Sequence, residues 1–242
     1  MVVVFKTEII VLCAFLVFAA VAIWASRGWR KRRLEALRRV AGALGLSFEG
    51  RSASFVIPGA KQFRLLRRGG MVDELMRGQR HGRAIAVFRH ILVVHYGQGA
   101  TVSFARVAAF QAGGHLPTFQ IRHQSWLTRL KRRLRRRDII FATHPEVTRR
   151  FYVTASDSNA VRAFFDGQVL SQLTTVPAGK FTVEASGTWL LVYCHGLRDW
   201  KPDAIPVFLE QAEILARIFL DRVEPKTHSF SRVASGMRSS VR

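Results

Sequence analysis

The sequence has few of the residues that build disulfide frameworks, metal centres and acidic active sites. Its 242 residues include two cysteines, Cys13 in a long apolar run and Cys194 in an apolar segment that we expect to be a buried strand. Two cysteines in such places offer neither a disulfide framework nor the ligand spacing of a metal site. Reduced thiols agree with a cytoplasmic domain. Asp and Glu number 16 against 38 Lys and Arg, and none lies between Glu74 and Asp138.

Catalytic motifs are also missing. The eight histidines form no HExxH pair, and His90 and His95 are five residues apart on a predicted strand, which places them on opposite faces. Asp73 and Glu74 are adjacent in a predicted strand, so their side chains should point apart and form no acid/base pair. The glycines at 97–99 lie between two strands and indicate a tight hairpin, not a phosphate-binding loop. We therefore expect no metal, no cofactor and no enzymatic activity.

One long apolar run is present, at residues 9–25. Ten of its seventeen residues are Leu, Ile, Val or Phe, which favours membrane insertion by roughly 3–6 kcal/mol. As a helix the run would be about 26 Å long, slightly short for a ~30 Å hydrocarbon core. The membrane interface at one end would hold Trp24 and Trp29, and at the other end Lys6. These side chains extend the span enough to make up the missing length. A cleaved signal peptide is the alternative, but its positive charges would precede the apolar stretch, and here they follow it.

The basic residues that follow this run set its orientation. Between Arg27 and Arg39 there are seven Lys or Arg residues and one acid, Glu35, so the positive-inside rule places the chain from residue 27 onward in the cytoplasm. We expect a single-pass protein of a bacterial inner membrane, with a short segment at 1–8, a transmembrane helix at 9–26, a basic juxtamembrane helix at 27–45, a cytoplasmic α+β domain at 46–224 and a disordered tail at 225–242. The juxtamembrane basic residues are Arg27, Arg30, Lys31, Arg32 and Arg33.

The cytoplasmic part has the pattern of an α+β domain with a mainly antiparallel sheet and packed helices. Short connections between the predicted strands favour antiparallel pairing. We expect strands at 54–57, 72–77, 83–95, 101–110, 117–122, 151–154, 181–185 and 189–194, and helices at 30–44, 61–68, 126–137, 158–169 and 202–222.

Three details of this pattern can be compared directly with a structure. The Ser186-Gly187 pair should form a hairpin turn, and the continuous apolar stretch after it should be among the most buried strands. Residues 60–122 and 158–195 each read as a helix followed by paired strands, so a duplicated helix-plus-hairpin unit is one interpretation. On the last helix, Glu213 and Arg217 should pair on the outer side.

The segment at 126–137 is the clearest candidate for a binding surface. Its leucines recur at helical spacing, and basic residues occupy its other faces. We expect an amphipathic helix on the inner leaflet, where each basic residue contributes about 1 kcal/mol. A solvated basic loop is the plain alternative, and nucleic acid would use the same charges but would favour interleaved aromatic residues. The residues expected to contact anionic lipid, or nucleic acid in the alternative, are Trp126, Arg129, Lys131, Arg132, Arg133, Arg135, Arg136 and Arg137.

Several short motifs accompany this layout. They are Phe63-Arg64-Leu65-Leu66-Arg67-Arg68-Gly69, Met76-Arg77-Gly78, Leu116-Pro117-Thr118-Phe119, Asp138-Ile139-Ile140-Phe141, Phe151-Tyr152-Val153 and Val161-Arg162-Ala163-Phe164-Phe165. Over roughly residues 10–220 the chain resembles a group of uncharacterised bacterial membrane-anchored proteins with a cytoplasmic α+β domain. The resemblance implies the anchor and the fold class, and it brings no activity.

These observations favour a non-enzymatic role. We expect a membrane-anchored scaffold or adaptor whose basic surface contacts anionic lipid, because the anchor keeps that surface beside the bilayer at all times. The alternatives are a membrane-tethered nucleic-acid-binding protein and, behind it, an enzyme acting on an anionic substrate.

Overall fold

The computed structural model describes residues 2–52, 57–97, 99–124, 139–176, 181–196 and 201–223. In the first 26 residues, side chains are described only at positions 15, 18, 21 and 24. The predicted strand at 54–57, apart from Ile57, lies outside this part of the chain. The same is true of the predicted helix at 126–137 and of the predicted tail at 225–242.

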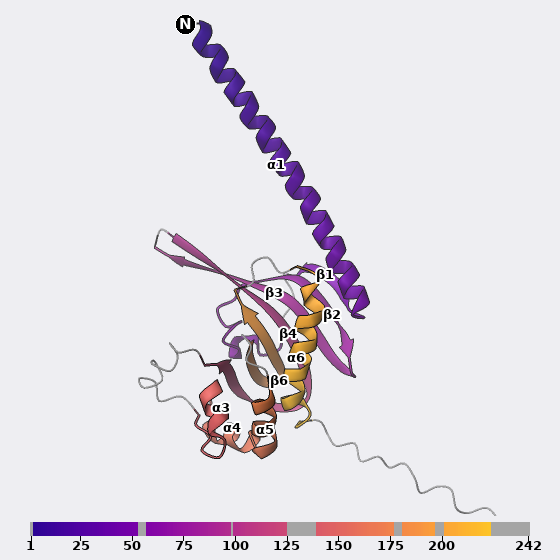
Figure 1. Ribbon diagram of the computed structural model, residues 1–242, viewed down its shortest axis with the longest axis vertical. Coiled ribbons are helices and arrows are strands. Elements are labelled where there is room, and N and C mark those ends of the chain that lie inside the picture. Colours follow the sequence, from indigo (N-terminus) through magenta and orange to yellow (C-terminus); the bar gives the residue numbers. More distant parts are fainter. Residues whose placement is uncertain are drawn as a thin grey trace, which may run out of the picture.

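The chain begins with a single helix, α1 (Val2–Ala43), which stands out from the rest of the molecule (Figure 1). The helix runs without interruption through the apolar run and the basic residues after it, and its 42 residues give it a length of about 63 Å. Among the described residues, no helix combines the length and the apolar character that crossing a membrane requires.

The described residues after α1 form a six-stranded antiparallel sheet, which confirms the α+β class. The strand order is β1-β2-β3-β4-β5, and β6 pairs with β4. The strands are β1 (Ser47–Ser52), β2 (Met71–Arg80), β3 (Arg83–Tyr96), β4 (Gly99–His123), β5 (Phe151–Ala155) and β6 (Phe181–His195). The first half of β4 lies between β3 and β6, and its second half lies between β6 and β5.

The strand β4 joins two segments that we expected to be separate strands. It is 25 residues long, and its pairing with β6 shifts register on both sides of Leu116. The bend brings the backbone of Gly114 against the carbonyl of Val223, where an added Cβ would lie 2.7 Å from that oxygen. A side chain at this position would therefore force the strand and the turn at 221–223 apart.

Each face of the sheet is covered by a different part of the chain. One face packs against the end of α1 and the helices α3 (Pro145–Arg150), α4 (Ser158–Phe164), α5 (Gly167–Thr175) and α6 (Ala204–Leu220). The other face is covered by the loop at 57–70, which contains a short 3-10 helix, η1 (Ala60–Gln62). Alternate residues of the strands therefore enter two separate apolar clusters, as Leu75 and Met76 do.

The predicted hairpin at Ser186-Gly187 is wrong. The strand β6 continues through both residues, and Gly187, with a φ of 60°, faces Leu116 at the point where the register shifts. The glycine allows a β-bulge instead of a reversal. The region at 181–195 therefore forms one strand where a hairpin was expected, and the described residues do not form a duplicated helix-plus-hairpin unit.

Other predicted elements are confirmed with changes in their limits. The predicted helix at 158–169 is two helices, because Asp166 begins a second one by accepting a hydrogen bond from the amide of Val169. The helix α6 matches its prediction closely. Its predicted Glu213–Arg217 pair is wrong, because Glu213 is buried and contacts Nε of Arg80 on β2 at 3.1 Å.

The predicted burial of the last strand is confirmed. Leu191 and Val192 have no exposed surface, and Cys194 next to them is buried. Burial raises the pKa of the Cys194 thiol to about 11.

We predict that Cys194 reacts slowly with maleimide until the domain unfolds. At pH 8 a thiol with a pKa near 11 has a thiolate fraction roughly 100-fold smaller than an ordinary thiol. In a Cys13→Ser variant, alkylation measured by mass spectrometry should therefore be slow in buffer and fast in denaturant. Equal rates in the two conditions would show that β6 is not buried as described.

Candidate functional site

The first candidate feature is the junction between α1 and the sheet. The last turns of α1 belong to the apolar core, since Leu37 and Ala41 are buried and Val40 and Leu44 pack beside them. These residues lie at helical spacing within the predicted helix at 30–44, and Leu34, one turn earlier, is exposed. The end of α1 is thus a structural part of the domain.

A distortion of β2 places two carboxylates on the same side of the strand at this junction. Glu74 has a φ of 54°, and the pairing of β2 with β3 shifts register between Asp73 and Met76. The expectation that the carboxylates of Asp73 and Glu74 point apart is therefore wrong. Both approach Nη2 of Arg89, at 2.6 Å and 3.3 Å respectively, because the left-handed residue turns its side chain out of the regular alternation.

Glu74 is the centre of a buried charge network. Its Oε1 accepts hydrogen bonds from Nε and Nη2 of Arg33 at 2.9 Å and 2.8 Å. Its Oε2 accepts one from Nη2 of Arg106 at 2.9 Å. Glu74 is 3% exposed and Arg106 2%. Three elements meet at this carboxylate, because Arg33 comes from α1, Arg89 from β3 and Arg106 from β4.

The pKa directions in the network follow from burial and pairing. Burial lowers the pKa of the Arg106 guanidinium, and the charge and hydrogen bond of Glu74 oppose that shift. Burial alone would raise the pKa of Asp73, but the hydrogen bond and charge of Arg89 outweigh it, so that the pKa is lowered. Glu74 is the carboxylate that all three arginines share, so its removal would cost the network more than the removal of any one arginine.

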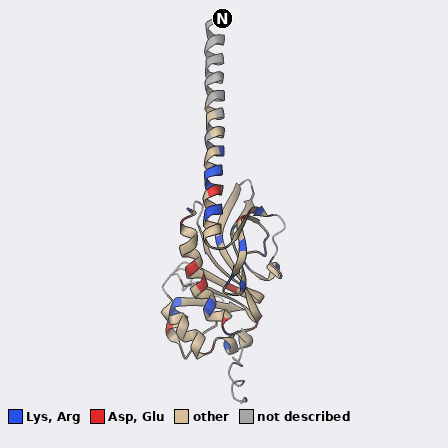
Figure 2. Ribbon diagram, turned by 90° about the vertical axis from the view of Figure 1, so that its right-hand side faces the viewer, with Lys and Arg blue, Asp and Glu red and all other residues tan. Residues whose placement is uncertain are grey.

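The structure divides the predicted juxtamembrane residues into two groups. Arg27, Arg30, Lys31 and Arg32 are exposed on α1, where Figure 2 shows basic turns above the sheet. Arg33 differs from these four, because its side chain is mostly buried against Glu74. The eight residues predicted to form the main contact surface, Trp126, Arg129, Lys131, Arg132, Arg133, Arg135, Arg136 and Arg137, lie outside the described residues.

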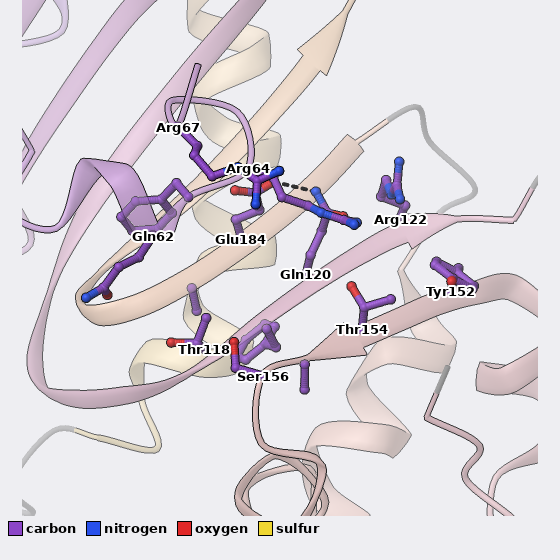
Figure 3. Close-up of a pocket in the computed structure, with 14 residues that line it drawn as sticks. Gln62, Arg64, Arg67, Thr118, Gln120, Arg122, Tyr152, Thr154, Ser156 and Glu184 are labelled. Atoms are coloured by element: carbon purple, nitrogen blue, oxygen red, sulfur yellow. Dashed lines mark hydrogen bonds between the residues drawn. The ribbon is translucent and has the colours of Figure 1, made fainter. Parts of the chain in front are cut away.

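The second candidate feature is a polar pocket on the opposite face of the sheet. It has a volume of about 650 Å³ and lies between the loop at 57–70 and strands β4, β5 and β6 (Figure 3). Its lining residues are Gln62, Phe63, Arg64, Arg67, Thr118, Phe119, Gln120, Arg122, Tyr152, Thr154, Ala155, Ser156, Glu184 and Ala185.

A fixed hydrogen-bond network holds the buried side of the pocket. Gln120 and Glu184 face each other in the register of β4 and β6, and Nε2 of Gln120 donates to Oε1 of Glu184. The hydroxyl of Tyr193 donates to the same oxygen at 2.6 Å, and the amide of Leu65 donates to the other oxygen at 3.4 Å. Burial, followed by the charge of Glu184, raises the pKa of Tyr193, so this phenol stays a donor.

Arginines line the open side of the pocket. Arg64 and Arg67 come from the loop, and Arg122 comes from the end of β4. Nη1 of Arg64 donates to Oε1 of Gln120 at 2.9 Å, and Arg122 lies over the ring of Tyr152 at 5.8 Å. Within the part of the chain that the structure describes, no carboxylate forms an ion pair with any of these three arginines.

The described lining of the pocket offers cationic and hydrogen-bonding side chains. Glu184 is the one carboxylate among the lining residues, and both of its oxygens already accept hydrogen bonds. Elsewhere among the described residues, no group of three or more His, Cys, Asp or Glu side chains is placed to hold a metal ion.

The sequence contained a signal for this pocket that our predictions did not use. Alternation in 117–122 and 181–185 places Gln120 and Glu184 on the polar sides of two strands. A pairing of those strands would have brought the two residues together. The loop arginines Arg64 and Arg67 lie in a motif that we noted only as part of a resemblance.

Comparisons with known proteins give a fold and no family. No protein-family model and no curated protein matches the chain. Among solved structures, the chain is similar to the mycobacterial trehalose monomycolate transport factor A, TtfA, with a TM-score of 0.52 and 14% sequence identity. The match covers 78% of this chain and 93% of that one. At this identity the likeness concerns the fold alone.

We predict that Glu74→Gln strongly destabilises the domain. The change removes the buried negative charge that pairs with Arg106 and Arg33, which should lower the free energy of unfolding by about 3–5 kcal/mol. Glu49→Gln is the matched control, because Glu49 pairs with Arg77 at the surface and should change stability by less than about 1 kcal/mol. Denaturant unfolding of the two variants in an uncharged detergent compares them. Similar losses for both would contradict the central role of Glu74.

Proposed function

We propose that this protein is a membrane-anchored scaffold or adaptor of a bacterial inner membrane. In this proposal residues 9–26 of α1 cross the bilayer, and the α+β domain lies on the cytoplasmic side. The observation that carries it is the continuity of α1, which joins the apolar run to the apolar core without a break. An anchor attached through a flexible linker would only keep a domain near the membrane, whereas a rigid one also fixes its orientation.

The length of the junction supports this proposal. Arg33 lies seven positions after Ser26, which corresponds to about 10 Å of helix. That distance is close to the Debye length at physiological ionic strength, so basic residues on the near side of the domain would feel the anionic headgroups. Arg27, Arg30, Lys31 and Arg32 are exposed along this stretch.

The β3–β4 hairpin would give the membrane-facing side of the domain a second point of contact with the bilayer. Its far end extends from the sheet toward the side from which α1 leaves (Figures 1 and 2). No Lys, Arg, Asp or Glu occurs between Arg89 and Arg106, and Val93 and Val102 are exposed. An uncharged strand pair with exposed valines suits the membrane interface better than open solvent.

One further fact supports a non-enzymatic role. Glu184 in the pocket is held by three hydrogen-bond donors and has no general base or nucleophile as a partner among the described lining residues. The anchored domain would then act by holding another component at the membrane.

We predict that the N-terminus lies outside and the domain inside. Single cysteines at positions 2 and 240, in a chain without Cys13 and Cys194, should differ in their reaction with an impermeant maleimide. In intact cells position 2 should be labelled and position 240 should be labelled only after permeabilisation. Labelling of position 240 from outside would contradict the proposed topology.

We predict that the segment at 126–137 binds anionic lipid. A fragment beginning at Arg27 keeps the α1 junction and should co-sediment with vesicles that contain phosphatidylglycerol. Replacing Arg132, Arg133, Arg135, Arg136 and Arg137 by Gln should abolish co-sedimentation, because each charge contributes about 1 kcal/mol.

Two controls separate this prediction from a general effect of charge. Replacing Lys226, Arg232, Arg238 and Arg242 near the C-terminus should leave most of the binding, and neutral vesicles should bind neither form. A fragment that ignores anionic vesicles but shifts RNA or DNA with a steep salt dependence would favour the nucleic-acid alternative instead.

A further inference from the structure

The pocket has the size of a small-molecule site. Its volume of about 650 Å³ lies within the range of about 300–1,000 Å³ that is usual for ligand pockets. Its buried side is rigid, because Gln120, Glu184 and Tyr193 satisfy one another through the hydrogen bonds described above. A ligand would therefore meet a surface that is already organised, which lowers the cost of binding.

The charge of the pocket favours an anion. Three arginines line it, and its one carboxylate is turned into the hydrogen-bond network on the buried side. The ion pairs among the described residues involve other arginines, and none of them includes these three. A guanidinium presents its donors in a planar fork, which suits phosphate oxygens.

The remaining polar groups favour a ligand with hydroxyls. Thr118, Thr154 and Ser156 line the wall along β4 and β5, and Gln62 faces them from the loop (Figure 3). The hydroxyl of Thr118 lies 3.0 Å from that of Ser186, and Ser186 in turn donates to Gln62. Side chains that both donate and accept in this way match the hydroxyl groups of a polyol. The cavity is also much larger than a lone phosphate ion would need.

We propose that the pocket binds a phosphate-bearing polyol. Arg67 and Arg122 hold the phosphate, Arg64 supports them, and the hydroxyl and amide side chains bind the polyol. This site goes beyond the proposed scaffold function and does not depend on it, because none of its residues belongs to α1 or to the segment at 126–137. The same chemistry occurs in soluble glycerol or sugar phosphates and in the headgroup of phosphatidylglycerol.

The test uses the full chain in an uncharged detergent and measures binding by isothermal titration calorimetry. Glycerol phosphate and glucose phosphate are the probes, and glycerol and glucose are their controls. Arg67→Gln and Arg122→Gln remove exposed side chains and should leave the fold intact. Each should weaken binding about 10-fold or more, since each removes charge-assisted hydrogen bonds. Arg67→Lys should recover part of the loss.

Arg68→Gln is the matched control, because Arg68 is an exposed neighbour of Arg67 that does not line the pocket. Binding of the phosphorylated probes that falls in Arg67→Gln and not in Arg68→Gln supports the site. Three results would overturn it. The phosphorylated probes could fail to bind at millimolar concentrations, or glycerol and glucose could bind as tightly as their phosphates. Arg67→Gln and Arg68→Gln could also weaken binding of the phosphorylated probes equally.

Binding measured in nanodiscs distinguishes a lipid headgroup from a soluble phosphate as the natural ligand. If the natural ligand is a lipid headgroup, nanodiscs of phosphatidylglycerol should compete with glycerol phosphate for the pocket. If it is a soluble molecule, the affinity for glycerol phosphate should be the same in phosphatidylglycerol and phosphatidylcholine nanodiscs. Failure of the vesicle experiment with the segment at 126–137 would leave these results unchanged, so the two proposals can fail separately.

Discussion

The long strand β4 is the constraint on which the rest of the structure depends. It pairs with β3, β5 and β6, and therefore fixes which side chains face which layer. Before the bend, Arg106 shares a face with Ala108 and Phe110, toward α1 and the helices. After the register shift beside Leu116 the alternation is reversed, so that Phe119 and Ile121 face the helices, and Thr118 and Gln120 face the pocket. A register shift of one residue exchanges the two faces of a strand. Because of this shift, Arg106 in the first half of β4 faces the α1 junction, and Gln120 in the second half faces the pocket.

The Glu74 network joins α1 to the sheet through hydrogen-bonded charges. Replacing a buried ion network by apolar side chains of similar volume is often neutral or stabilising, because the charges must be desolvated. An apolar contact, however, tolerates sliding and rotation. A carboxylate that accepts hydrogen bonds from both Arg33 and Arg106 is satisfied in one arrangement only. The network therefore specifies how the helix meets the sheet, and this orientation is what a rigid membrane anchor would need.

The parts of the fold that follow regular periodicity could be predicted from the sequence, and the parts that depend on bulges could not. Alternation placed β3 and the buried end of β6, and helical spacing placed α6. The bulges at Glu74 and Gly187 have no periodic signature, so the first was read as regular strand and the second as a turn. The edge strand β1 was missed because its sequence, Ser-Phe-Glu-Gly-Arg-Ser, is mostly polar. The pocket was missed because its residues come from four separate elements, which only the tertiary fold brings together.

The net charge of +22 is spread over several different environments in the structure. Arg33, Arg89 and Arg106 belong to the buried network, while Arg64, Arg67 and Arg122 line the pocket on the other face. The arginines of the network are paired with Glu74 and Asp73, so they add little to the charge that a partner at the surface would feel. A count of basic residues therefore overestimates the charge available to an anionic membrane or nucleic acid. Local sequence, such as the exposed basic residues of α1, is a better guide to that partner than the total charge.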